Sequence, residues 1–182
     1  MRLPLVAAAL AAVWLGACKL PRPPMKSYDY PALGFSVSFP APPKLSNDPA
    51  SADGSPASVT VESGDGARDF AISITNAPDP SEDIDAATTA SAAAMAKGLG
   101  AEPGVRTYAA TAEGVMGREF VLSKNGRAAA KVRLFLAGGR FYVLAGKSLA
   151  GVDDPAVDDF LSSFHVTATP PPSNTAANAP AP

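Results

Sequence analysis

The chain has 182 residues, of which 47% are hydrophobic and 18% are charged, so its central part is able to bury a core. Fifteen basic and seventeen acidic residues give a formal net charge of -2, which argues against general nucleic-acid binding, because that needs an excess of Lys and Arg. One cysteine and one histidine exclude an intrachain disulfide and a Cys/His zinc site. A Ser-His-Asp triad would have to use His165.

The N-terminal residues have the pattern of an export signal. Arg2 is followed by an apolar run over residues 3–15, which is short of the roughly 20 residues of a membrane-spanning helix. The run ends in Leu15-Gly16-Ala17-Cys18, which resembles the lipobox of bacterial lipoproteins. The resemblance implies cleavage before Cys18, a diacylglyceryl thioether on its sulfur and acylation of the freed amine. The alternative is an ordinary signal peptide in which Cys18 is incidental.

We therefore predict four segments. Residues 1–17 are the signal peptide, 18–26 a lipidated cysteine with a proline-rich tether that lifts the domain off the bilayer, 27–168 the folded domain, and 169–182 a disordered Pro/Ala tail. The tether bases Lys19, Arg22 and Lys26 are expected to favour an anionic surface. Lys19 stands where an Asp would retain a lipoprotein of enteric bacteria in the inner membrane, so we expect the periplasmic face of the outer membrane.

The first half of the domain shows alternation typical of half-buried strands. Strands are predicted at residues 35–39, ending before Pro40, from Val59 onward, and at residues 70–74. Residues 41–56, rich in Pro, Asp, Ser and Ala, are predicted to form a loop.

Two helices are predicted. The first is capped by Ser81, carries acidic residues in its first turn and ends near Gly98. Its expected buried stripe is Ile84, Ala87, Ser91, Ala94 and Met95. The second begins at Pro155 after Asp153 and Asp154, and its expected buried stripe is Val157, Phe160, Leu161 and Phe164.

The strands between the helices are predicted from whether their apolar residues occupy even or odd positions, since alternate residues of a strand share one face. Apolar residues occupy even positions on both sides of Asn125-Gly126, and a three-residue loop with Gly126 left-handed would pair even with even positions. A two-residue loop at Gly138-Gly139 then places Phe141, Val143 and Ala145 on the same face. A strand near residues 105–111 is expected to join them. The order of elements indicates an α+β fold with an antiparallel sheet sandwiched by helices.

The domain resembles the PsbP/Mog1-like fold family of small bacterial envelope proteins. The segments that carry the resemblance are residues 33–40, Gly117-Arg118-Glu119-Phe120, residues 139–144 and residues 160–164. The resemblance implies an antiparallel sheet between helices and an accessory or binding role, with no shared active site. It implies no cofactor and no catalytic residue.

The sequence contains no residue pattern that favours a catalytic or metal-binding site. His165 directly follows the apolar stripe of the last helix, which favours a structural or exposed histidine over a catalytic base. The aspartates at 153, 154, 158 and 159 are explained by capping and by a solvated helix face, so no metal site is predicted. Residues 48–85 hold nine acids and one base, whereas residues 105–147 hold eight bases and two acids, an asymmetry that would suit an acidic partner or an anionic surface.

The face opposite the predicted core mixes charges with large apolar residues. Its candidate binding residues are Arg133, Phe135, Arg140 and Tyr142, because partner surfaces favour arginine and aromatic side chains. The competing interpretation is that the last helix covers the two rings and leaves the arginines as rim charges. The predicted function is a non-enzymatic, lipid-anchored envelope protein that binds or scaffolds a protein partner. Alternatives are a carrier of a small or lipidic ligand in a cavity between sheet and helix, and an envelope hydrolase.

Overall fold

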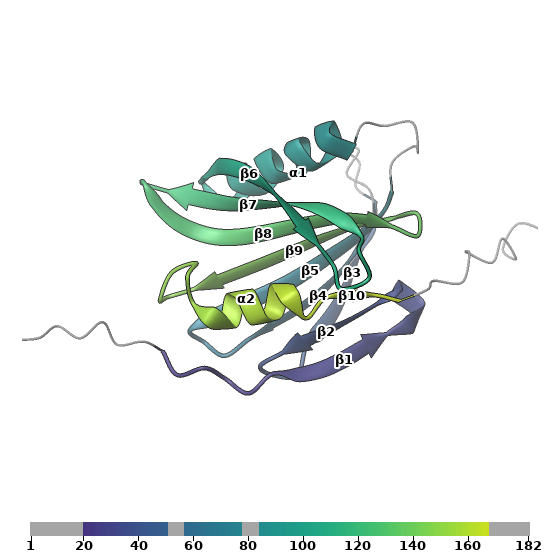
Figure 1. Cartoon of the computed structure of the whole chain (residues 1–182), viewed down its shortest axis with the longest axis horizontal. Helices are drawn as coiled ribbons and strands as arrows, with labels where there is room; N and C mark the ends of the chain where they lie inside the picture. Colours follow the sequence, from purple (N-terminus) through teal and green to yellow (C-terminus); the bar gives the residue numbers. More distant parts are fainter. Residues whose placement is uncertain (1–19, 51–56, 78–83, 168–182) are drawn as a thin grey trace, which may run out of the picture.

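The computed structural model describes residues 20–50, 57–77 and 84–167. They form an α+β fold of two antiparallel sheets and two helices (Figure 1). A seven-stranded sheet has the order β3-β4-β5-β9-β8-β7-β6, and a small sheet has the order β1-β2-β10. The large sheet comprises β3 Lys44–Asp48, β4 Ser58–Gly64, β5 Arg68–Asn76, β6 Glu102–Ala110, β7 Met116–Lys124, β8 Arg127–Ala137 and β9 Arg140–Ser148. The small sheet comprises β1 Lys26–Tyr30, β2 Phe35–Phe39 and β10 His165–Val166.

The turn after β8 follows the predicted geometry. Gly138 and Gly139 both have positive φ, and Ala137 pairs with Arg140, so Leu134 lies opposite Val143 as expected. This register fixes the meander of β8 and β9.

The β7–β8 hairpin has the predicted pairing of even with even positions, but its turn differs from the predicted one. Lys124 pairs with Arg127, so the loop is the two-residue turn Asn125-Gly126, with both residues at positive φ. A bulge then shifts the register, because Leu122 pairs with Ala130 while Ser123 pairs with Ala128. Even positions therefore face even positions, as predicted, but the extra residue lies in the strand and not in the loop.

The larger core lies on the face that carries Phe135, Tyr142 and Leu144. Helix α2, Pro155–Ser162, and strand β2 cover this face, and rings from both sides pack together. Gly146 of β9 allows α2 to approach, since a Cβ there would lie 2.9 Å from Val157 Cγ1. The buried side chains are Phe35, Val37, Phe39, Val61, Phe70, Ile72, Ile74, Phe135, Tyr142, Leu144, Ala156, Val157, Phe160, Leu161 and Phe164.

The second core lies under helix α1, Ile84–Leu99, on the opposite face. It contains Phe120, Leu122, Ala130, Val132, Leu134 and Phe141, which confirms the predicted burial of these positions. Leu136, Val143 and Ala145 of the same predicted set are partly buried, and Met116 and Ala128 are exposed. The helix itself buries Thr88, Ala92 and Ala96, whereas Ala94 of the predicted stripe is exposed. The faces of an alanine-rich helix differ little in hydrophobicity. The buried positions therefore lie one residue after the predicted Ala87, Ser91 and Met95.

Two edge strands were not predicted. Strand β3 lies within the expected 41–56 loop and is exposed along its length, which leaves no alternation to detect. Strand β1 pairs with β2 through all five residues, beginning at Lys26, which the sequence placed in the tether. The predicted signal peptide, Cys18, the Ser81 cap and the tail lie outside the described residues.

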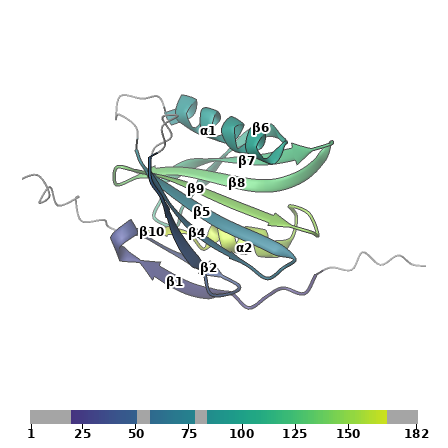
Figure 2. The same cartoon turned by 180° about the vertical axis from the view of Figure 1, so that it is seen from behind.

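The described chain enters and leaves at opposite ends of the molecule. The coloured ribbon begins at the left of Figure 1, below the β9–α2 loop, and ends at the right after β10. Figure 2 shows the other face, where α1 lies over one part of the large sheet and β3, β4 and β5 extend beyond it. Within residues 20–50, 57–77 and 84–167, no helix is long and apolar enough to span a membrane.

Candidate functional site

The predicted aromatic binding residues are core residues. Phe135 and Tyr142 are 1% and 0% exposed and lie opposite each other in the β8–β9 register, as the sequence predicted. Their rings pack against Phe164, and the Tyr142 hydroxyl donates to the Leu33 carbonyl oxygen at 2.9 Å. The proposed exposed aromatic surface is therefore wrong, because α2, its following residue Phe164, and β2 cover this face.

The two predicted arginines remain at the edge of that core. Arg133 Nε donates to Glu119 Oε2 at 2.7 Å, and its Nη1 lies 3.4 Å from Ser162 Oγ at the end of α2. Arg140 is partly buried, and its Nη1 has no hydrogen-bond partner among the described residues. The structure brings these arginines to the rim around buried rings; partner binding by them stays a prediction.

The single histidine joins two segments that are distant in sequence. His165 Nδ1 lies 2.7 Å from Glu113 Oε1, and the Val166 amide donates to the other Glu113 oxygen. Burial alone would raise the pKa of Glu113, but hydrogen bonds from His165, Thr111 and nearby amides outweigh it and lower the pKa to about 2. The pair ties β10 to the β6–β7 loop, which is a structural use of His165.

The predicted excess of basic charge is largely balanced in three dimensions. Lys131 pairs with Asp158 at 2.7 Å, Lys147 pairs with Asp69 at 3.0 Å, and Arg118 pairs with Asp85. Charges that separate along the sequence therefore meet across strands and between sheet and helix. No group of three or more His, Cys, Asp or Glu side chains suited to hold a metal occurs in the part of the chain that the structure describes.

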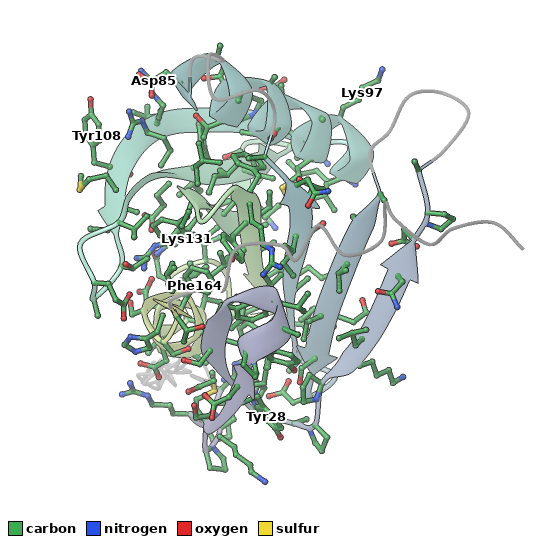
Figure 3. The ribbon with its side chains drawn as sticks, turned by 90° about the vertical axis from the view of Figure 1, so that its right-hand side faces the viewer. Tyr28, Asp85, Lys97, Tyr108, Lys131 and Phe164 are labelled. Atoms are coloured by element: carbon green, nitrogen blue, oxygen red, sulfur yellow. The ribbon has the colours of Figure 1, made fainter. Side chains whose placement is uncertain are left out.

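An exposed surface with aromatic and basic side chains lies at one end of the β6–β7 pair. Tyr108 is 72% exposed and Met116, which pairs with Ala110 two residues further along β6, is 55% exposed. Tyr108 lies near Asp85 at the start of α1 (Figure 3). The Arg118 guanidinium lies 4.4 Å from the Tyr108 ring centroid, and Arg118 and Arg106 both pair with Asp85. Figure 3 shows Tyr108 pointing outward, with Asp85 above it. We call Tyr108, Met116, Arg106, Arg118 and Asp85 the Tyr108 end.

A groove lies beside the C-terminal part of α1, over the open part of the sheet. Its volume is about 790 Å³, and small residues such as Ala71, Ala130 and Ala145 form its floor. Met95 and Leu99 of α1 form one side. The other sides carry Lys44, Glu62, Asp69 and Lys147. The groove is partly open to solvent and has a charged rim, which distinguishes it from the closed apolar cavity expected of a lipid carrier.

The opposite end of the molecule holds a buried ion cluster. Arg68 and Asp154 side chains are each 3% exposed and are joined by an Nε–Oδ2 hydrogen bond of 2.7 Å. Arg68 also donates to Asp65 Oδ2 and to the Pro21 carbonyl oxygen, both at 2.9 Å. Asp154 accepts from Ser148 Oγ at 2.6 Å and caps α2 through the Ala156 amide. We call this cluster, with residues 20–22, 64–67 and 149–153, the Arg68 end.

Hydrogen bonds keep the acids of this cluster ionised. Burial alone would raise the pKa of Asp154, but donors on Ser148, Arg68 and Ala156 outweigh it and lower the pKa below its ordinary value. Asp65 behaves in the same way, with donors on Ala67 and Arg68. The cluster therefore joins the N-terminal segment, the β4–β5 turn, the end of β9 and α2 through paired charges.

No family model and no curated protein matches the sequence. Among solved structures, the solution structure of cyanobacterial PsbP (CyanoP) from Synechocystis sp. PCC 6803 is similar, with a TM-score of 0.55. The alignment covers 78% of this chain and 92% of that chain, at 13% sequence identity. The chain has a PsbP-like fold. At this identity the likeness shows the fold alone, and it confirms the fold predicted from the sequence.

Sequence reasoning missed the sites at both ends of this PsbP-like fold. Tyr108 belongs to the strand predicted near residues 105–111, for which no buried face was predicted. In the sequence, Arg68 stands out only as the one base in an acidic stretch. An isolated base among nine acids was the available signal for a paired, buried arginine, and no pattern indicated Pro21 as its partner.

Proposed function

We propose that the protein is a lipid-anchored cell-envelope protein that binds a protein partner and does not act as an enzyme. The anchor is proposed on the lipobox-like residues 15–18, with the periplasmic face of the outer membrane as the location. The folded domain would then be presented to the periplasm on a short tether.

The observation that carries partner binding is the surface at the Tyr108 end. Tyrosine, methionine and arginine are enriched at protein interfaces, and here Tyr108 and Met116 are exposed beside two arginines. Val105, 83% exposed, adds apolar area on the same edge strand. The stacking of Arg118 on Tyr108 holds the ring in place, so less side-chain freedom would be lost on binding.

The anchor is tested by Cys18→Ser. We expect loss of the acyl mass on the mature N-terminus and accumulation of unprocessed precursor, measured by mass spectrometry. An unmodified mature terminus that begins at another residue in the natural protein would refute the anchor.

The partner surface is tested by cross-linking in cells with a photoreactive residue at position 108. Leu45 is the matched control, since it is also an exposed large hydrophobic residue, 52% exposed, on the other edge strand of the sheet. We expect a discrete protein adduct from position 108 that position 45 does not give. Identical adducts from both positions, or none from 108, would contradict the proposal.

A second candidate function is the carriage of a small ligand in the groove. Its volume of about 790 Å³ lies in the range of ligand sites. Replacing both Ala71 and Ala145 of the floor by Leu would narrow it. Native mass spectrometry of the purified protein should then show a bound molecule in the natural chain and less of it in the narrowed variant; the absence of any bound molecule in the natural chain would count against carriage.

A further inference from the structure

The N-terminal segment is bound to the domain before it reaches the first strand. The Pro21 carbonyl oxygen accepts from the buried Arg68, and the Arg22 guanidinium pairs with Asp159 of α2. Met25 packs against the larger core. Residues 21–25 are therefore part of the folded domain, and the predicted tether of residues 18–26 is shorter than the sequence indicated.

This contact limits how far the domain can lie from an anchor at Cys18. Pro21 is the third residue after Cys18, and an extended chain spans at most about 3.6 Å per residue. The Pro21 contact can thus lie no more than about 11 Å from the lipidated cysteine. The domain end that holds Pro21 would lie close to the bilayer, and the tether would not lift it away.

The same end presents an apolar loop. Leu149 is 83% exposed, at the end of β9, and its amide donates to the Ala67 carbonyl oxygen in the β4–β5 turn. Ala150, which follows it, is also exposed. The nearby bases are paired, with Arg22 on Asp159 and Lys147 on Asp69, and the loop also carries the exposed acid Asp153. Apolar contact is therefore better supported here than attraction between a basic patch and anionic headgroups.

We infer that the Arg68 end binds the bilayer surface, with Leu149 as its apolar contact, and that the Tyr108 end faces away from the membrane. This inference rests on the proposed anchor at Cys18. Tyr108 is in register with Arg118, Leu134 and Val143 across the sheet. Val143 precedes Leu149 by six residues, so Tyr108 lies about 20 Å further along the strand direction. The partner surface would then be accessible from the periplasm.

The experiment measures the depth of two labelled positions on the complete lipidated protein. Leu149→Cys and Tyr108→Cys each carry a fluorophore, and Cys18 does not compete because lipidation occupies its thiol. The probe is phosphatidylcholine vesicles that contain a nitroxide-headgroup lipid. We expect quenching at position 149 to be several-fold stronger than at position 108. Equal quenching, or stronger quenching at 108, would overturn the inference.

A longer tether provides the matched control. Eight Gly/Ser residues inserted between Lys19 and Leu20 should leave the acyl mass unchanged and reduce quenching at 149 toward the level at 108. Unchanged strong quenching at 149 would refute the role of the short tether. The absence of an acyl group in the natural chain, read from its mass before the vesicle measurement, would instead refute the proposed anchor, so the two failures are distinguishable.

Discussion

The two ends of the strands use arginine in opposite ways. At the Arg68 end, the guanidinium is 3% exposed and joins four segments of the chain through Asp65, Asp154 and Pro21. At the Tyr108 end, Arg106 is 41% exposed and its partner Asp85 is 37% exposed, so water screens the pair. The comparison teaches that burial decides whether an ion pair fixes the fold or leaves a surface available for binding.

Removing one arginine from each end should separate these roles most strongly. Arg68→Met leaves Asp154 buried with fewer donors, and breaking a buried pair from one side costs about 3 to 5 kcal/mol. Arg106→Met should cost less than about 1 kcal/mol, because the pair is exposed. Urea denaturation of both variants measures the difference. Equal losses of stability would contradict the contrast between the two ends.

A second comparison lies within strand β7. Phe120 is 4% exposed under α1, so Phe120→Ala should cost about 3 to 5 kcal/mol through cavity formation. Met116, at the other end of the strand, is 55% exposed, and Met116→Ala should change stability by about 0.5 kcal/mol or less. Thermal unfolding of the pair checks this. A large loss in Met116→Ala would show that the Tyr108 end is part of the core.

Acid should weaken the Arg68 end and the Glu113–His165 contact in overlapping pH windows. The folded pKa values of Asp65 and Asp154 are lowered, so their stabilisation is complete above about the ordinary value of 3.8 and is lost as pH falls below it. Glu113 is lowered from 4.5 to about 2, so its contribution is lost between these values. Denaturation at pH 6 and at pH 2 should therefore show Glu113→Gln destabilised at pH 6 and close to the natural chain at pH 2. A difference that persists at pH 2 would contradict the linkage.

The smallest expected change in stability is at Tyr108. Tyr108→Ala removes an exposed ring and should alter the free energy of unfolding by no more than about 0.5 kcal/mol. The same variant should reduce binding of the proposed partner, because the ring is the most exposed aromatic contact on that surface. Melting temperature and partner cross-linking, measured together, test whether the Tyr108 end serves binding more than folding.

Much of the local structure was determined by the sequence. The alternation of residues 35–39 and 70–74, the glycines of the β8–β9 turn and the Asp154-Pro155 start of α2 each specify a backbone geometry by themselves. These signals are short-range, since they depend on φ preference, side-chain capping and the two-residue repeat of a strand. They were sufficient for the α+β fold class.

Only the tertiary structure decided which surfaces are covered and which partners meet. Phe135 and Tyr142 have the composition of a binding face, yet α2 and β2 pack over them because a two-sided sheet must bury both apolar faces. Arg68 could be assigned its role only when the β4–β5 turn, α2 and Pro21 met in space. Contacts between residues separated by tens of positions produce no periodic pattern in the sequence. Local sequence therefore predicts the strands, whereas the contacts of the Arg68 end and the Tyr108 end form only in the folded chain.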